Sequence, residues 1–375
     1  MATMNNNKYD TNILLKVHSS RYNKWFEVCR FTKYSIDMDL ETDADAFSFT
    51  VLNPNGINTG LFSKFDEVTI EIDKTPIMLG RIDNVTYSWD DDGCVIDIEG
   101  RDLMADLVDN DAIPGTKKNV KPKTYIKNKC DEYGIKSKIN ASMDTIEQLV
   151  IGAGESEISI INNIVTESRK RTWFLYDTLY AGDWNDDAAP KYLFTRGVKD
   201  RPGIPIKKLT LREDGTDMKS EVRIYGSNSD GAEKVVGTAK NEYMIDRGIK
   251  KRMVKRAQNN NSVSKYKANA LRDIRDSFRD NVELEIEIKT GHGAKLIMPN
   301  QTAQVIDTMT KLNAVFFIVG VNYSKSIGSG STTKITMIPG DIAFDLVWKN
   351  QSKTSASFTG TSKMTLAELI TSRKG

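Results

Sequence analysis

The stretch Val85–Ile98, VTYSWDDDGCVIDI, decides the fold. Apolar and polar residues alternate on both sides of its acidic centre, which is the period-two pattern of half-buried β-strands. Gly93 follows Asp92 at the centre, and glycine accepts the positive φ that a tight hairpin connection requires. The stretch therefore predicts a β-hairpin, and the alternating residues 68–72 predict a strand before it.

A second hairpin is similar to the first. Val321–Ser324 (VNYS) matches Val85–Ser88 (VTYS), and Lys334–Gly340 (KITMIPG) matches Cys94–Gly100 (CVIDIEG) in its alternation and its final glycine. An Ile-Asp step precedes each hairpin, at Ile72-Asp73 and Ile306-Asp307. Two interpretations stay open on this pattern: a likeness that any two hairpins share, or a duplicated β module.

The predicted fold class is mainly β (α+β), with four parts along the chain. They are a first β domain (1–115), a mixed α+β domain (116–204), a second β domain with one helix at about 263–280 (205–348), and a flexible tail rich in Ser, Thr and Lys (349–375). In the mixed part, a hairpin is expected between Thr172–Tyr176 and Lys191–Thr195. A helix is expected over 157–171, since Ile161, Ile164 and Val165 share one side.

Composition excludes several classes of protein. The 375 residues carry 53 Lys plus Arg against 51 Asp plus Glu, so the net charge of +2 gives no bulk attraction to nucleic acid or membrane. The three cysteines are far apart, which argues against a disulfide framework or a zinc site. No apolar run reaches the ~20 residues of a membrane helix, and no signal peptide is expected.

A compact motif lies around the end of the first hairpin. Gly100 is expected to end its strand where a side chain would crowd the turn, and Asp102 is expected to cap a short helix over 102–108. Arg81 and Arg101 can bind carboxylates across the sheet. We interpret this set as a corner of the fold and not as a binding site. Its members are Gly80, Arg81, Asp83, Gly100, Arg101, Asp102, Asp106 and Leu107.

Six cations fall within ten residues later in the chain. One interpretation is contact with DNA or with an acidic partner surface, and the other is a solvated strand face or loop. The absence of interleaved aromatic residues favours the second. The cluster consists of Arg247, Lys250, Lys251, Arg252, Lys255 and Arg256.

No pattern of residues selects a catalytic, metal or cofactor site. The two histidines, His18 and His292, are typical of surface turns, and no nucleophile elbow, phosphate loop or zinc motif is present. The run Asp90–Gly93 is similar to the start of a calcium loop. It lacks the alternate oxygens at Cys94 and the final glutamate, where Arg101 stands. We therefore predict that the protein is not an enzyme.

Several segments resemble a known family. The first half carries Phe47–Pro54 (FSFTVLNP), Leu79–Asp83 (LGRID) and Ile98–Asp109 (IEGRDLMADLVD). The second half carries Glu221–Gly226 (EVRIYG), Met298–Asp307 (MPNQTAQVID) and Phe317–Tyr323 (FIVGVNY). These segments resemble the late control protein D family, the baseplate hub proteins of contractile phage tails and tail-like bacteriocins.

The resemblance implies a homotrimer in which each subunit holds two tube-type β-barrel domains in tandem, with the mixed region inserted between them. Three subunits would form a pseudo-six-fold ring that adapts the six-fold tail tube to a three-fold spike. Implied partners are the tail tube or a tube-initiator protein, a spike on a separate chain, and the baseplate wedge proteins. DNA would be met only by passage through the channel. The protein would be made in the bacterial cytoplasm and built into a tail or tailocin particle.

Two other functions stay open on the sequence. A cell-wall hydrolase carried in a tail would need a pair of carboxylates, and no feature selects one among 51 acids. A nucleic-acid-binding module would use the basic cluster at 247–256.

Overall fold

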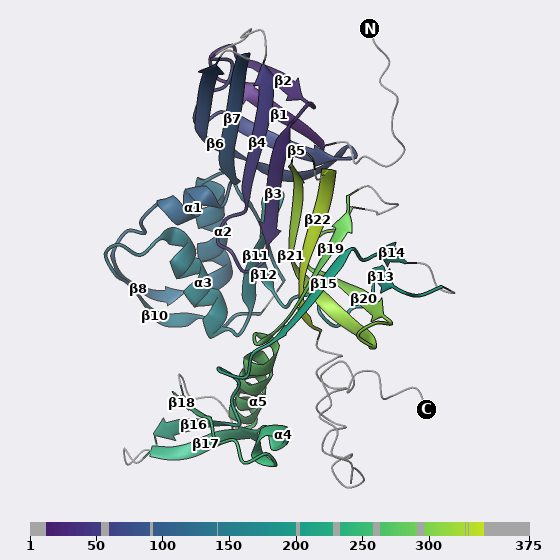
Figure 1. Ribbon diagram of the computed structural model, residues 1–375. Helices are drawn as coiled ribbons and strands as arrows, with labels where there is room; N and C mark the ends of the chain where they lie inside the picture. The colour runs from purple at the N-terminus through teal and green to yellow at the C-terminus, as the bar shows by residue number, and fades with distance from the viewer. Residues whose placement is uncertain are drawn as a thin grey trace. The chain divides into compact units, whose positions relative to one another are not determined.

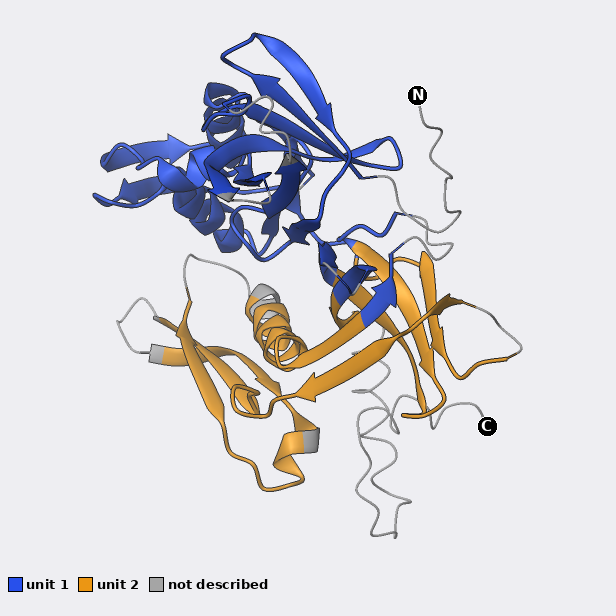
Figure 2. Ribbon diagram, turned by 45° about the horizontal axis from the view of Figure 1, so that its top comes forward, with its two compact units in different colours: residues 1–185, 287–300, 319–335 blue, residues 186–286, 301–318, 336–375 orange. Residues whose placement is uncertain are grey.

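The computed structural model of the protein (Figure 1) describes residues 13–53, 60–90, 93–140, 142–199, 203–227, 233–257, 263–290, 296–326, 328 and 330–340. The chain falls into two compact units, and distant parts of the sequence contribute to each. Figure 2 colours unit 1 (1–185, 287–300 and 319–335) blue and unit 2 (186–286, 301–318 and 336–375) orange. The predicted tail 349–375 and His292 lie outside the described residues.

Seven antiparallel strands form the first strand set, which lies in unit 1. They are β1 (Ile13–Ser19), β2 (Lys24–Val28), β3 (Lys33–Asp39), β4 (Ala46–Asn53), β5 (Glu67–Ile72), β6 (Thr75–Asp90) and β7 (Gly93–Asp102). Hydrogen bonds join them in the order β2-β1-β5-β6-β7-β4-β3. Burial alternates along β1 and β7, so one face of each strand enters the core while the other meets solvent. The predicted hairpin is the pair β6–β7.

Helices and short strands follow the first strand set in unit 1. They are α1 (Ala105–Asp109), β8 (Gly115–Val120), α2 (Pro122–Glu132), β9 (Lys136–Ile139), β10 (Ile146–Ile151), α3 (Glu157–Glu167), β11 (Arg171–Leu175) and β12 (Thr178–Gly182). They share one apolar core, in which Ile126, Ile161 and Ile164 are fully buried. Cys130 lies in the same core, and burial raises the pKa of its thiol to about 12.

The predicted hairpin between Thr172–Tyr176 and Lys191–Thr195 is wrong. β11 pairs with β12 instead, and Tyr176 in the connecting turn adopts a φ of 61°. Closing the short turn between β11 and β12 costs less conformational entropy than closing a long loop from β11 to residue 191 would. Residues 192–196 instead form β13, which pairs in parallel with β20, so they join the second strand set and not the predicted 116–204 part.

The second strand set has its own order. It contains β13 (Tyr192–Arg196), β14 (Ile204–Pro205), β15 (Lys208–Glu213), β19 (Val282–Lys289), β20 (Gln301–Asp307), β21 (Leu312–Ser326) and β22 (Gly330–Pro339). Hydrogen bonds join these strands in the order β14-β13-β20-β21-β22-β19-β15. Strands β19, β21 and β22 contribute residues to both units. Within unit 1, β21 also pairs with β3, through Gly320–Lys325.

Unit 2 also holds a small separate sheet with its own helix. The elements are β16 (Glu221–Ser227), β17 (Glu233–Lys240), α4 (Glu242–Ile245), β18 (Arg252–Arg256) and α5 (Val263–Arg279). Helix α5 occupies the residues where spacing predicted a helix, and it packs against β16 and β17 (Figure 1). Tyr266, Ala270 and Ile274 of α5 form the apolar contact with this sheet.

We expect Ile286→Glu to prevent folding. Ile286 is fully buried in β19, so an unpaired carboxylate there would cost at least about 4 kcal/mol of the free energy of unfolding. Circular dichroism and thermal denaturation would measure the loss. Glu283→Gln, at an exposed position of the same strand, is the matched control and should melt like the parent chain. A cooperative transition for Ile286→Glu near the parent's midpoint would contradict the assignment.

Candidate functional site

Gly80 and Gly100 let β6 and β7 approach more closely than side chains would permit. A Cβ on Gly80 would lie 2.1 Å from the carbonyl oxygen of Arg101, and one on Gly100 would lie 2.1 Å from that of Arg81 and 2.4 Å from Cζ of Phe47. Gly100 lies inside β7 and does not end it, which corrects the sequence-based expectation. The glycine is required by the neighbouring strand and the Phe47 ring, and not by a turn.

Arg81 and Arg101 lie directly opposite each other in the β6–β7 register. Two cations in that position repel, and nearby carboxylates compensate. Arg81 Nη1 contacts Asp106 at 2.8 Å. Arg101 reaches Asp83 and Asp109, both at 2.7 Å. Asp106 and Asp109 lie on α1, so the ion pairs fasten this helix to the two strands.

These ion pairs are partly exposed, which limits their energy. The Arg101 guanidinium holds the pKa of Asp109 below its usual range, and Asp109 and Asp83 in turn raise the pKa of Arg101. Solvent screens such pairs, so each contributes at most about 1 kcal/mol. Their role is to fix the direction of α1 more than to supply stability.

Asp102 is buried at the end of β7 and does not start a helix. Helix α1 begins at Ala105, three residues later than the sequence indicated, and its N-cap residue is Met104. The Asp102 carboxylate accepts hydrogen bonds from the backbone N–H of Met104 (2.9 Å) and of Asp45 (3.2 Å). It therefore joins the β3–β4 connection to the start of the helical region.

Asp45 and Asp102 form a buried pair of carboxyl groups. Burial raises the pKa of Asp102 to about 7. Burial, and then the charge of Asp102, raises the pKa of Asp45 well above its usual value. Asp45 accepts a hydrogen bond from the N–H of Asp39 at 2.8 Å, which opposes the shift only in part.

Leu107 completes the motif on the apolar side. It is fully buried and lies in the core shared by the helices α1, α2 and α3, together with Leu103 and Met104. The eight predicted motif residues thus meet at one corner of unit 1, where the β6–β7 pair joins α1. Their charged groups bind one another, which suits a structural corner and leaves little for chemistry on a substrate.

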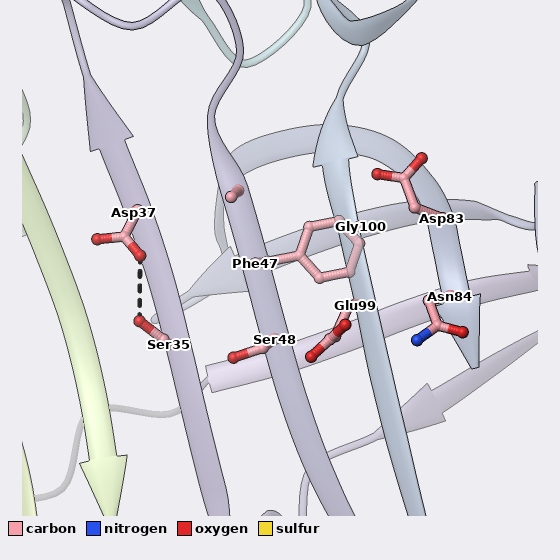
Figure 3. A pocket seen from close by; sticks show the side chains of 9 residues that line it. Ser35, Asp37, Phe47, Ser48, Asp83, Asn84, Glu99 and Gly100 are labelled. Atoms are coloured by element: carbon pink, nitrogen blue, oxygen red, sulfur yellow. Dashed lines mark hydrogen bonds between the residues drawn. The ribbon is translucent and has the colours of Figure 1, made fainter. Parts of the chain in front are cut away.

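A shallow hollow lies on the outer face of β3, β4, β6 and β7 (Figure 3). Its volume is about 310 Å³, and its floor is Gly100 with the Phe47 ring beside it. Asp37, Glu99 and Asp83 give it an acidic lining. Asp37 accepts a hydrogen bond from Ser35 (3.2 Å), and Asp83 is bound by Arg101.

The described residues offer little catalytic chemistry elsewhere. His18 lies in β1, and its ring centroid is 5.2 Å from that of Trp25. Among the described residues, no group of three or more His, Cys, Asp or Glu could hold a metal ion. In the same part of the chain, no helix is long and apolar enough to cross a membrane.

The basic cluster lies on β18 and the turn before it. Arg252 binds Glu221 at 2.7 Å, and Lys255 binds Asp273 of α5 at 2.8 Å. Lys251 donates to the carbonyl oxygens of Gly215 and Thr216, at 2.6 and 2.8 Å. Arg247 and Lys250 are exposed in the turn, and Arg256 ends the strand. Lys251, Arg252 and Lys255 are thus committed to contacts inside the protein.

Sequence reasoning missed a buried ion pair in unit 2. Asp307 is fully buried, and Arg196 donates to both of its oxygens at 2.9 and 2.7 Å. Burial alone would raise the pKa of Asp307, but hydrogen bonds from Arg196 and Thr310 outweigh it and lower the pKa to about 2. The Ile306-Asp307 step was visible in the sequence, yet its partner lies 111 residues away on β13.

The fold is that of phage tail proteins. A tail protein from Neisseria meningitidis matches 88% of this chain over 97% of its own, with a TM-score of 0.72 and 20% identity. The 43 kDa tail protein of prophage MuSo2 from Shewanella oneidensis matches 88% over 98%, with a TM-score of 0.70 and 18% identity. A type VI secretion component from E. coli matches 87% over 76%, with a TM-score of 0.54 and 11% identity.

A family model gives the more particular result. Residues 12–102, which hold the first strand set, match the model described as Mu phage baseplate assembly protein GpP-like, N-terminal. No curated protein matched the sequence. The resemblance to phage baseplate hub proteins is confirmed at this level, and the assignment to the late control protein D family stays a prediction.

We expect Gly100→Ala to destabilise unit 1 by about 3 kcal/mol. The added methyl group would overlap the Arg81 carbonyl and the Phe47 ring, and the paired strands leave it no room to move. Chemical denaturation would measure the change. Gly215→Ala is the matched control, since its Cβ would meet nothing within 4 Å. Equal stability of the two variants would contradict the close approach.

The buried pair predicts a pH dependence with a definite sign. Because the folded-state pKa of Asp102 is raised to about 7, the folded chain keeps a proton that the unfolded chain releases above about pH 4. The free energy of unfolding should therefore fall as pH rises from 4 to 7. The fall is at most about 1.4 kcal/mol per pH unit for one carboxyl group.

Asp102→Asn should make the free energy of unfolding fall less steeply with pH when denaturation is measured at several pH values. The part of the fall that comes from the Asp45 carboxyl group should remain. Asp109→Asn is the control. The pKa of Asp109 is lowered, so its removal acts in the opposite sense and leaves the decline in place. A stability profile of Asp102→Asn that parallels the parent's would show that Asp102 does not titrate in this range.

Proposed function

We propose that this chain is the baseplate hub of a contractile tail, a homotrimer that adapts the six-fold tail tube to a three-fold spike. The observation that carries the proposal is the shared order of the two strand sets. The first reads β2-β1-β5-β6-β7-β4-β3 and the second reads β14-β13-β20-β21-β22-β19-β15. When the seven strands of each set are renumbered 1 to 7 in chain order, both sets read 2-1-5-6-7-4-3.

The two hairpins that looked alike in the sequence occupy corresponding places in these orders. β6 and β7 correspond to β21 and β22, and the Ile-Asp steps end the corresponding strands β5 and β20. The two sets differ in strand direction at one end: β1 pairs with β2 and β5 antiparallel, whereas β13 pairs with β14 and β20 in parallel. The common order favours a duplicated module over a chance likeness of two hairpins.

A duplicated module has a use in a symmetric ring. A head-to-tail contact that closes around a three-fold axis makes a ring, and two similar modules in each of three chains give six similar positions. One end of the ring would then match a six-fold tube and the other a three-fold spike. In this proposal each module is a tube-type β-barrel, and residues between them form the inserted mixed region.

The proposed partners are those that the resemblance to baseplate hub proteins implies. They are a second and third copy of this chain, the tail tube or a tube-initiator protein, a spike on a separate chain, and the wedge proteins. Support comes from structural neighbours: one is a VgrG protein in complex with PdpA, and another is a secretion component similar to phage T4 tail proteins gp27 and gp5. The particle, a phage tail or a tail-like bacteriocin, would assemble in the bacterial cytoplasm, and DNA would only pass through the channel.

The other two functions have less support. A wall hydrolase needs free carboxylates, whereas Asp83, Asp106 and Asp109 are bound by arginines. A nucleic-acid module needs cations free to reach phosphates, and three of the six in the basic cluster are held inside the protein.

We expect the purified chain to form a trimer, alone or on adding its spike or tube partner. The mass measured by light scattering should be three times the 42.1 kDa of one chain. An obligate ring contact should bury at least about 2,000 Å². A pull-down with the neighbouring tail proteins is the companion measurement.

A monomer that binds neither partner would end the hub proposal. Clearing of purified cell wall in a zymogram, lost on replacing one Asp or Glu, would favour the hydrolase instead. The parent chain mixed with an unrelated trimeric protein is the control for non-specific association.

A further inference from the structure

The small sheet β17-β16-β18 has one covered face and one open face. Val222 and Ile224 of β16 are buried against α5, and Met253 of β18 packs on the same side. Side chains alternate across a strand, so their neighbours in sequence lie on the opposite face. Among the described helices, only α5 makes extensive contact with this sheet, on the covered side, and Val235 and Val254 on the opposite face are exposed.

Apolar side chains stand exposed on the open face. Val254 of β18 is 59% exposed and Val235 of β17 is 39% exposed. Val235 lies opposite Tyr225 of β16, and Val254 lies opposite Arg223. The apolar groups therefore extend across the three strands, as in the centre of a protein interface.

Positive charge surrounds these apolar groups. Arg223 and Arg252 both bind Glu221, at 2.8 and 2.7 Å, and these contacts hold the pKa of Glu221 below its usual value. Arg256 and Lys240 lie on the same face by strand alternation and register. The described side chains of the open face thus include four cations, two of which share the carboxylate of Glu221. Lys255 points the other way, to Asp273 of α5.

The edge of this sheet is also unpaired. β18 ends the order β17-β16-β18 and pairs only with β16 among the described strands. In a parallel pair, alternate residues direct their N–H and C=O groups away from the neighbour. These groups form a template on which a further strand can add.

We propose that this face and the β18 edge bind an extended acidic segment of another tail protein. Such a segment would pair its backbone with β18, pack apolar residues on Val254, and place carboxylates near Arg252 and Arg256. Nucleic acid fits less well, because Glu221 lies among the cations and exposed valines give phosphates nothing to contact. The proposal does not depend on ring formation.

A labelled peptide tests the proposal on the full chain. The probe is a short fluorescein-labelled peptide of alternating Glu and Val, with the matching Lys-Val peptide as its control. Fluorescence anisotropy should give a dissociation constant of about 100 µM for the acidic peptide. Val254→Asp should weaken binding about tenfold, since it adds a negative charge at the centre of the face. It should fold normally, because residue 254 is 59% exposed.

Val150→Asp is the matched control, since Val150 is a 62% exposed strand residue of unit 1. It should bind the acidic peptide like the parent chain. The proposal is overturned if the acidic peptide does not bind, if Val254→Asp binds it as well as Val150→Asp does, or if the Lys-Val peptide binds equally. Tighter binding of a duplex DNA would replace the protein partner by nucleic acid. Self-association that Val254→Asp abolishes would make a second copy the occupant.

Discussion

The closeness of β6 to β7 at Gly80 and Gly100 is the constraint on which unit 1 depends. Each glycine faces a carbonyl oxygen of the other strand at a distance that excludes a side chain. The register shifts between Ile82 and Asn84, beside this contact, and the bulge bends the pair there.

The charged residues of this protein mostly serve its own architecture. Asp102 accepts hydrogen bonds from the backbone N–H groups of Met104 and Asp45. Asp307 binds Arg196, and Glu157 of α3 binds Lys129 of α2 at 2.6 Å. Each replaces water on a buried carboxylate with donors from a distant segment, which offsets much of the cost of burial. Several of the acidic residues therefore hold distant segments of the chain together.

Local patterns in the sequence predicted the elements that depend on neighbours along the chain. The β6–β7 hairpin, α5 and the strands around Gly328 follow from period and turn chemistry, and the structure contains them. The pattern failed where a strand had two candidate partners. β11 and β13 both read as strands, but nothing in their residues tells that one pairs with β12 and the other with β20.

The candidate site divides in the same way. Gly100–Asp109 is a continuous run, so the sequence alone places those residues near one another. The roles of these residues could be read only from the fold. Gly100 is required by the close approach of the paired strand β6, and Asp102 accepts a hydrogen bond from the N–H of Asp45, which lies 57 residues earlier. The Arg196–Asp307 pair joins residues 111 apart, so no local signal indicated it.

The three cysteine thiols of this protein differ in exposure and therefore in reactivity. Cys94 and Cys130 are buried, and burial raises the pKa of the Cys130 thiol to about 12, which favours its neutral form at pH 7. The thiolate is the form that oxidises and exchanges, so Cys130 is protected even in air-exposed, oxidising surroundings. Cys29, between β2 and β3, is exposed. The native chain thus offers a maleimide dye one favoured point of attachment, without any engineered cysteine.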